Sequence, residues 1–128
     1  MKKINSLLLA LLLVSALFHA LPGSVGADEM TKTKNGIEAA LKVDPSRSMI
    51  DLYLADAKTK EAVTEAKVRV KVALPDGTVV EKDLLGMKMG PAFSFMNTLD
   101  MSRNGRYSFD IQVETGKTTA SFRFTADI

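Results

Sequence analysis

Apolar and polar residues alternate with a period of two over most of the chain after residue 36. This period places successive side chains on opposite faces of an extended strand, so that one face can line a core. No segment in this range keeps the 3.6-residue period of an amphipathic helix. The pattern predicts an all-β protein, and its clearest apolar stripes run from Ile37 to Val43, Ile50 to Leu54, Val68 to Leu74 and Tyr107 to Val113.

Turn sequences separate these stripes at intervals of about eight to twelve residues. Pro75-Asp76-Gly77 is the strongest, because proline presets φ and glycine accepts a positive φ. Gly86 to Pro91 interrupts the alternation, and Asn104-Gly105 and Thr115-Gly116-Lys117 mark further turns. About seven strands result, which is typical of an immunoglobulin-like antiparallel β-sandwich, with a closed barrel as the competing architecture.

Tyr107 stands at the entrance to the sixth predicted strand, two residues after Gly105. This spacing is similar to the tyrosine corner of such sandwiches, in which the phenol ties down a turn. The alternative is that Tyr107 is only the first core residue of its strand.

The third predicted strand carries Lys67, Arg69 and Lys71 on its outward face. In an immunoglobulin-like sandwich its neighbour is the sixth strand, whose outward face includes Asp110 and Glu114. Opposite charges on neighbouring strands contribute about 0.2–1 kcal/mol per pair. We therefore expect this basic stripe to be neutralised within the sheet rather than offered to a partner.

Residues 1–27 depart from the alternation and read as a secretory signal peptide. Two lysines precede an uncharged apolar run from Leu7 to Phe18, and Val25 and Ala27 occupy the small-residue positions of a cleavage site. The run is shorter than the ~20 apolar residues that span a bilayer. We expect cleavage after Ala27, or alternatively after Ala20, and a periplasmic or secreted protein without stable membrane insertion.

Cleavage after Ala27 leaves 101 residues, which is enough for one domain. Residues 28–35 lack periodicity and are interpreted as a flexible N-terminal tail, and residues 36–128 as the sandwich domain. Loss of the two leader lysines from 17 Lys and Arg balances the 15 Asp and Glu, which argues against nucleic-acid binding. The leader also holds the only histidine, His19, and the chain has no cysteine.

Without histidine or cysteine, the common nucleophile–base arrangements of enzymes are excluded. Asp51 is the one acidic residue inside an otherwise apolar stripe, and alternation places it on the outer face as a solvated charge. We expect a non-catalytic binding or accessory module, a monomer with an unidentified protein partner in the exported compartment. Its expected contact surface is a pair of loops at one end, Gly86 to Pro91 and Met101 to Gly105.

Methionine is the one unusual chemical resource of the domain. Four methionines fall within 15 residues, namely Met87, Met89, Met96 and Met101. Thioether sulfur is a soft ligand that suits Cu(I) and needs no deprotonation, and Met-x-Met in a strand places both sulfurs on one face. A Cu(I)-binding carrier is therefore the alternative function. The same residues could instead fill the core or form an adaptable contact patch for a protein.

The stretch from Met49 to Ile128 resembles the YtkA-like family of exported or membrane-anchored bacterial domains. The resemblance covers about eighty residues and is carried by Asp56–Val68 (DAKTKEAVTEAKV), Pro75-Asp76-Gly77, Gly105-x-Tyr107-x-Phe109 and Ser121–Phe124. It implies a sandwich similar to CopC-like and FixH-like proteins, with a link to metal, often copper, or to respiratory-complex assembly. Those relatives usually combine histidine with methionine at the metal, and this chain has Met87 and Met89 in that region without the histidine.

Overall fold

The computed structural model describes residues 28–128, so the predicted signal peptide lies outside the described residues. Eight strands and one short 3-10 turn, η1 (Pro45–Arg47), make up this part of the chain. The strands are β1 (Asp28–Lys34), β2 (Ile37–Asp44), β3 (Met49–Asp56), β4 (Lys67–Ala73), β5 (Val79–Met89), β6 (Ala92–Thr98), β7 (Arg106–Glu114) and β8 (Thr119–Asp127). Within residues 28–128 there is no helix long and apolar enough to cross a membrane.

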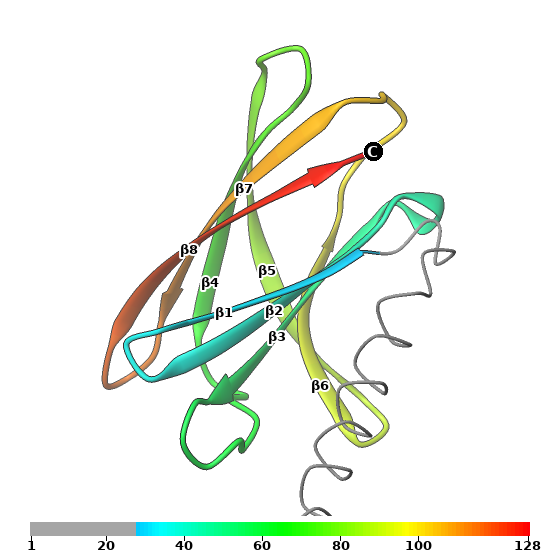
Figure 1. The fold of residues 1–128 in the computed structure, drawn as a ribbon. Coiled ribbons are helices and arrows are strands. Elements are labelled where there is room, and N and C mark those ends of the chain that lie inside the picture. The colour runs from blue at the N-terminus through cyan, green and yellow to red at the C-terminus, as the bar shows by residue number, and fades with distance from the viewer. Residues whose placement is uncertain (1–27) are drawn as a thin grey trace, which may run out of the picture.

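The strands form an immunoglobulin-like antiparallel β-sandwich, as the alternation predicted (Figure 1). Their order is β1-β2-β3-β6-β5-β4-β7-β8, and every pairing is antiparallel. The first layer comprises β1, β2, β3 and β6, and the second comprises β4, β7 and β8. Strand β5 belongs to both, because Val79–Leu84 pairs with β4 and Leu85–Met89 pairs with β6.

The core lies between the layers and is built from the apolar stripes that the sequence shows. Strands β2, β4, β7 and β8 bury every second residue, which is the mark of one face turned inward. Burial of one such Leu, Val or Phe side chain stabilises the fold by roughly 1.5–3 kcal/mol. The largest of the fully buried side chains are Tyr107, Phe109, Phe124, Leu41 and Ile50.

The segment interpreted as a flexible tail is instead strand β1, and this expectation was wrong. β1 pairs along β2 from Asp28 opposite Val43 to Lys34 opposite Ile37. The strand is polar because it is the outermost strand of its layer, and among the side chains of residues 30–34 only Met30 packs against the core. Backbone pairing and the turn at Asn35-Gly36, where both residues have positive φ, hold it in place.

Strands β1 and β8 lie at the two ends of the strand order and meet along one side of the sandwich (Figure 1). The Lys32 ammonium donates a hydrogen bond to the Arg123 carbonyl and lies 5.5 Å from the centre of the Phe124 ring. The Asn35 side-chain amide donates to the Thr119 carbonyl at 2.9 Å. These contacts join the two layers where no strand connects them.

Tyr107 is a core residue and also ties down a turn, so both interpretations of its position hold. Its side chain is buried, and its hydroxyl donates a 2.7 Å hydrogen bond to the Arg103 carbonyl. Gly105, between the two, has a φ of 138° and exchanges backbone hydrogen bonds with Ile128 at 2.7 and 2.8 Å. The tyrosine corner therefore fixes the entry to β7 and the C-terminus together.

The basic stripe of β4 lies beside β7, with Lys67 opposite Glu114 and Lys71 opposite Asp110, as predicted. The ion pairs of this stripe are formed with β5 instead, where Arg69 meets Asp83 at 3.4 Å and Lys71 meets Glu81 at 3.7 Å. Two of the three basic side chains, Arg69 and Lys71, are thus paired within their own sheet, by β5 rather than by β7.

The predicted break from Gly86 to Pro91 is shorter than expected, because β5 continues through Met89 and turns only at Gly90-Pro91. This turn and the loop of residues 99–105 lie at opposite ends of the sandwich, since all of β6 runs between them (Figure 1). The expectation that they form one contact surface was wrong.

Candidate metal centre

Three of the four predicted methionines share the outer face of the first layer. Met87 and Met89 are two residues apart on β5, point to the same face and are 50% and 53% exposed. Met96, half-buried, lies opposite Leu85 on β6. In a sheet, residues directly opposite each other share a face, so Met96 joins the same surface.

Met87 is the member that the other two can both reach. Residues two apart on a strand are separated by about 6.7 Å, and diagonal neighbours across a strand pair by about 7–8 Å. Met87 stands in the first relation to Met89 and in the second to Met96. Met89 and Met96 lie farther apart, at opposite ends of this row, so any centre here needs Met87.

Gly86 allows the hairpin to hold its methionines outward. A Cβ at this position would lie 2.8 Å from Phe93 Cζ and 3.4 Å from Phe95 Cε2. The two phenyl rings pack edge to face with their centres 5.4 Å apart, directly over the missing side chain. The inner face of the hairpin is therefore occupied by aromatic packing, which leaves Met87 and Met89 on the solvent side.

Met101 is not part of this surface. Its side chain is 3% exposed and belongs to the hydrophobic core. It follows β6 in the loop before β7, whereas Met87 and Met89 lie next to the β5–β6 turn at the other end of β6. Met101 therefore acts as a core-filling residue, the alternative role considered for methionine.

Two oxygen atoms on the same outer face lack hydrogen-bond partners. Among the described residues, Asp51 Oδ1 and Ser94 Oγ are the buried side-chain polar atoms without one. Ser94 is 2% exposed and lies opposite Met87, and Asp51 lies opposite Met96. Each orphaned group carries a desolvation cost of about 1–3 kcal/mol unless something else satisfies it.

In the environment of Asp51, the effect of burial on the pKa outweighs that of the nearby positive charges. Burial raises the pKa of this carboxyl above its usual value, while Lys42 on β2 and Arg47 in η1 act in the opposite direction. Asp44 adds a smaller upward push on the same pKa. Asp51 is consequently not the freely solvated charge that the sequence suggested.

A metal at this face would have to use thioethers. Residues 28–128 contain no histidine or cysteine, and they contain no group of three or more carboxylates placed to hold a metal ion. The soft donors that the face offers are the sulfurs of Met87, Met89 and Met96, which suit Cu(I). The chemistry of the residues present thus fits copper and does not fit the usual carboxylate or imidazole sites.

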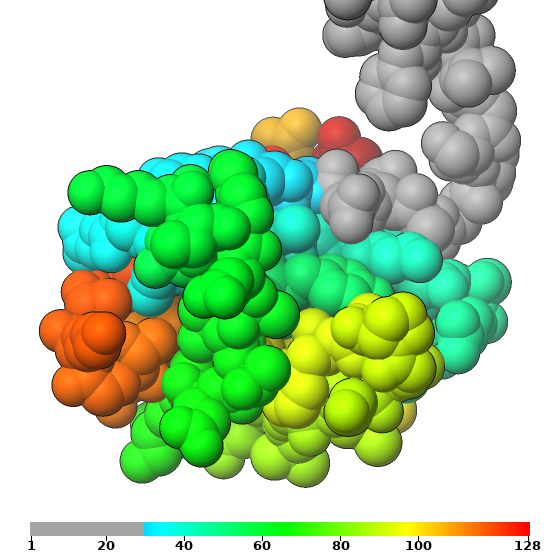
Figure 2. All heavy atoms as spheres, turned by 90° about the horizontal axis from the view of Figure 1, so that it is seen from below, coloured from blue at the N-terminus to red at the C-terminus, as the bar shows by residue number. Residues whose placement is uncertain are grey.

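A groove of about 350 Å³ opens beside this face. It forms because β3 and β6 pair only from Met49 to Leu52, after which the Leu54 carbonyl accepts instead from Val63 N–H at 2.8 Å. The groove is lined mainly by small and aromatic side chains, among them Tyr53, Ala62 and Phe93. Figure 2 shows the neighbouring end of the molecule, where the loop of residues 57–66 lies beside the β5–β6 hairpin.

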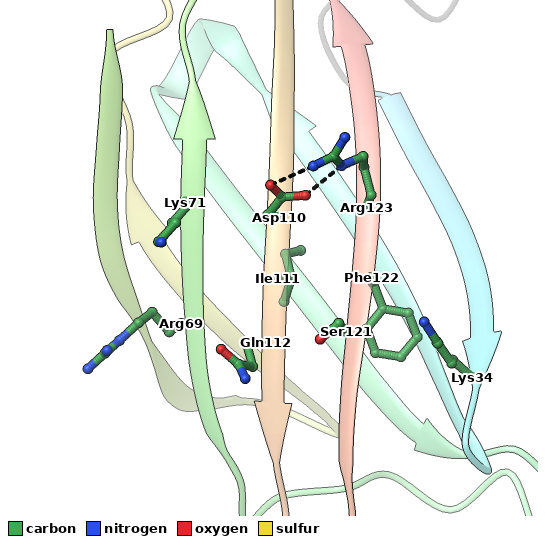
Figure 3. Close-up of a pocket in the computed structure, with 9 residues that line it drawn as sticks. All are labelled: Lys34, Arg69, Lys71, Asp110, Ile111, Gln112, Ser121, Phe122 and Arg123. Atoms are coloured by element: carbon green, nitrogen blue, oxygen red, sulfur yellow. Dashed lines mark hydrogen bonds and ion pairs between the residues drawn. The ribbon is translucent and has the colours of Figure 1, made fainter.

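A second hollow, of about 460 Å³, lies over β4, β7 and β8 on the other layer. Figure 3 shows Asp110 and Arg123 facing each other across β7 and β8, joined by hydrogen bonds of 2.7 and 3.0 Å. Arg69 and Lys71, which also line it, have carboxylate partners on β5. Because four of the five charged side chains that line it are already paired, this hollow offers less binding chemistry than the methionine face.

The sequence matches no protein-family model and no curated protein. Its fold does match solved structures. FetP from uropathogenic Escherichia coli strain F11 superposes with a TM-score of 0.62 at 12% identity, covering 79% of this chain and 95% of FetP. A DUF4426 family protein from Pseudomonas aeruginosa PAO1 gives 0.65 at 18% identity, covering 78% and 96%.

Copper-reconstituted P19 from Campylobacter jejuni matches with a TM-score of 0.57 at 14% identity, covering 80% of this chain and 93% of P19. A variant of FetP was also solved with copper bound, and FetP itself was expressed in the periplasm. At these identities the likeness shows the fold alone, and this fold agrees with the sandwich that the resemblance implies. The narrower YtkA-like assignment rests on the sequence motifs alone.

Proposed function

We propose that this protein is an exported, non-catalytic copper carrier of YtkA-like type that binds Cu(I) through methionine on the outer face of its first layer. The observation that carries the proposal is the placement of Met87, Met89 and Met96 on one accessible face. The copper-bound neighbours of the same fold support it. The proposal favours the carrier over the general binding module that the sequence suggested first.

The thioethers of Met87 and either neighbour would hold the ion, with Met87 common to both pairings. Neutral sulfur donors keep their affinity at any pH, because they have no proton to lose. An exposed site on two strands leaves the ion accessible to another protein, as a carrier requires. We place the protein in the periplasm or outside the cell, as a monomer released from its leader.

Titration of the domain starting at Asp28 with Cu(I), against a competing chelator, tests the proposal. We expect one ion bound, with affinity lowered by at least about tenfold in Met87→Leu and less in Met89→Leu or Met96→Leu, since a sulfur ligand is lost each time. Met101→Leu is the matched control, because it exchanges one buried methionine and leaves the face intact. Equal affinity in all four variants, or no binding by the wild type, contradicts the proposal.

The exposure of Leu85 supports a second candidate function, in which the same face binds a protein partner. The Leu85 side chain is 63% exposed beside Met96 and Met87, and leucine cannot bind metal. A photo-crosslinking residue at position 85 should capture a partner in the exported compartment. Val79, 62% exposed on the part of β5 that pairs with β4, is the control position. Equal crosslinking at both positions contradicts a specific surface.

A further inference from the structure

We infer that Asp51 and Ser94 belong to the same centre as Met87 and Met96, and that the centre is a mixed carboxylate–thioether site that holds Cu(II) as well as Cu(I). The inference rests on the proposed copper function and adds two oxygen donors to it. It concerns binding only, with no electron transfer implied.

The register brings Asp51 and Met96 close together. Leu99 N–H donates to the Ser48 carbonyl at 2.9 Å, which fixes the phase of the β3–β6 ladder. Three residues farther along, the directly opposed pair Asp51 and Met96 is then of the non-hydrogen-bonded kind. In such pairs the Cα atoms lie about 4.5 Å apart and the side chains approach most closely. The carboxylate and the thioether therefore emerge side by side.

Ser94 completes a compact group of four. It is two residues from Met96 on β6, on the same face, and directly opposite Met87 on β5. Met87 and Met96 are diagonal neighbours, so each of the four side chains borders at least two others. Three strands thus present two sulfurs and two oxygens around one point of the outer face.

The unsatisfied oxygens distinguish this group from an ordinary surface. Asp51 Oδ1 and Ser94 Oγ are both buried without a partner. Within residues 28–128, Asp51 forms no ion pair within 4.0 Å, although Lys42 lies opposite it and Arg47 is near enough to affect it. Arg47 pairs instead with Asp44 at 4.0 Å. A bound cation would satisfy the carboxylate that the neighbouring lysine and arginine leave unpaired.

The four donors divide by chemical hardness. Carboxylate and hydroxyl oxygen suit harder ions such as Cu(II), and thioether sulfur suits Cu(I). Loss of Asp51 should therefore weaken Cu(II) more than Cu(I), and loss of a methionine should do the reverse. A site made only of methionine would show no such division.

Competition titrations with Cu(II) and with Cu(I) on the domain starting at Asp28 test this division. We expect Asp51→Asn, which keeps the shape and removes the charge, to lower Cu(II) affinity by at least about tenfold and Cu(I) affinity by less than about threefold. Ser94→Ala should have the same sign and a smaller effect. Asp83→Asn is the matched control, since it neutralises an outward aspartate that pairs with Arg69 on the other layer.

X-ray absorption at the copper edge of the wild type supplies a test that does not depend on how a variant folds. We expect oxygen scatterers near 2.0 Å together with sulfur near 2.3 Å, the distances usual for such ligands. Cu(I) binding that depends on Met87, combined with Cu(II) binding indifferent to Asp51, overturns this inference and leaves the proposed function standing. Failure of the wild type to bind either ion overturns both.

Discussion

Single residues decide whether the β5–β6 hairpin can present its methionines. Gly86 has an ordinary strand conformation, so its importance lies in the space that it leaves for Phe93 and Phe95.

Asp56 stabilises the backbone turn at the end of β3. One of its carboxylate oxygens accepts the backbone N–H groups of Lys58 and Thr59 at 2.8 and 2.9 Å.

Gly86→Ala should lower the free energy of unfolding by about 1–3 kcal/mol, the usual cost of overpacking. The new Cβ would lie 2.8 and 2.9 Å from two atoms of the Phe93 ring, which must move. Urea denaturation followed by circular dichroism measures the effect. Gly116→Ala is the matched control, because its Cβ would meet nothing within 4 Å. Equal stability of the two variants would show that the ring yields freely.

Asp56→Asn should flatten the acid limb of the stability curve. The hydrogen bonds from Thr59 and Lys58 hold the pKa of Asp56 below its usual 3.8. A lowered folded-state pKa contributes stability above pH 3.8, and this contribution is lost as the pH falls through the folded-state value. Urea denaturation from pH 2.5 to 7 should show a shallower loss in the variant. Because asparagine still offers an acceptor oxygen, a large loss at pH 7 would contradict this account.

Among the elements, β1 is a strand that the alternation of apolar and polar residues does not predict. Strands β2, β4, β7 and β8 were predictable because each buries every second residue. β1 carries almost no apolar residues and does not depend on them for its position. Backbone pairing with β2 and hydrogen bonds from Lys32 and Asn35 to β8 hold it in place. Asn35-Gly36 was the available signal, because this dipeptide favours the tight turn of a hairpin.

Removal of residues 28–34 should lower the free energy of unfolding by more than about 3 kcal/mol, because the whole β1–β2 ladder is lost at roughly 0.5–1.5 kcal/mol per hydrogen bond. Thermal or urea denaturation of the truncated domain measures this loss. Lys32→Ala, which removes only the side-chain tie to β8, should cost far less. A truncated domain as stable as the original would restore the interpretation of this segment as a tail.

The candidate site was predictable only in part, for reasons that also lie in the elements. The clustering of Met87, Met89 and Met96 was visible in the sequence, and their common face follows from the pairing of β5 with β6. Met101 shares the same stretch of sequence and lies in the core, a difference that composition cannot reveal. The nearness of Asp51 to Met96 depends on β3 pairing with β6, two strands that are distant along the chain.

At the scale of the whole molecule, the two outer faces differ in character. The second layer carries ion pairs such as Arg123–Asp110 and Arg69–Asp83, all at exposed positions. Such surface pairs contribute only about 0–1 kcal/mol each to stability, and their main effect is to neutralise several of the charges on that face. The first layer instead exposes Leu85, Met87 and Met89. The asymmetry directs binding to one side of the sandwich.

Strand β5 connects the candidate site on the first layer to the backbone of the second layer, so copper binding at the site should change backbone motion in both layers. Its first half holds the second layer and its second half carries Met87 and Met89, along one unbroken backbone. A ligand that reduces the motion of Leu85–Met89 should slow amide hydrogen exchange in that segment. Because the strand is continuous, exchange should also slow in Val79–Leu84. The matched segment is Thr119–Asp127 of β8, in the same layer without that covalent continuity, where exchange should stay unchanged. Mass spectrometry of the exchanged protein, with and without copper, would measure this change. Slower exchange in the second layer would then report copper binding on the face of the first layer.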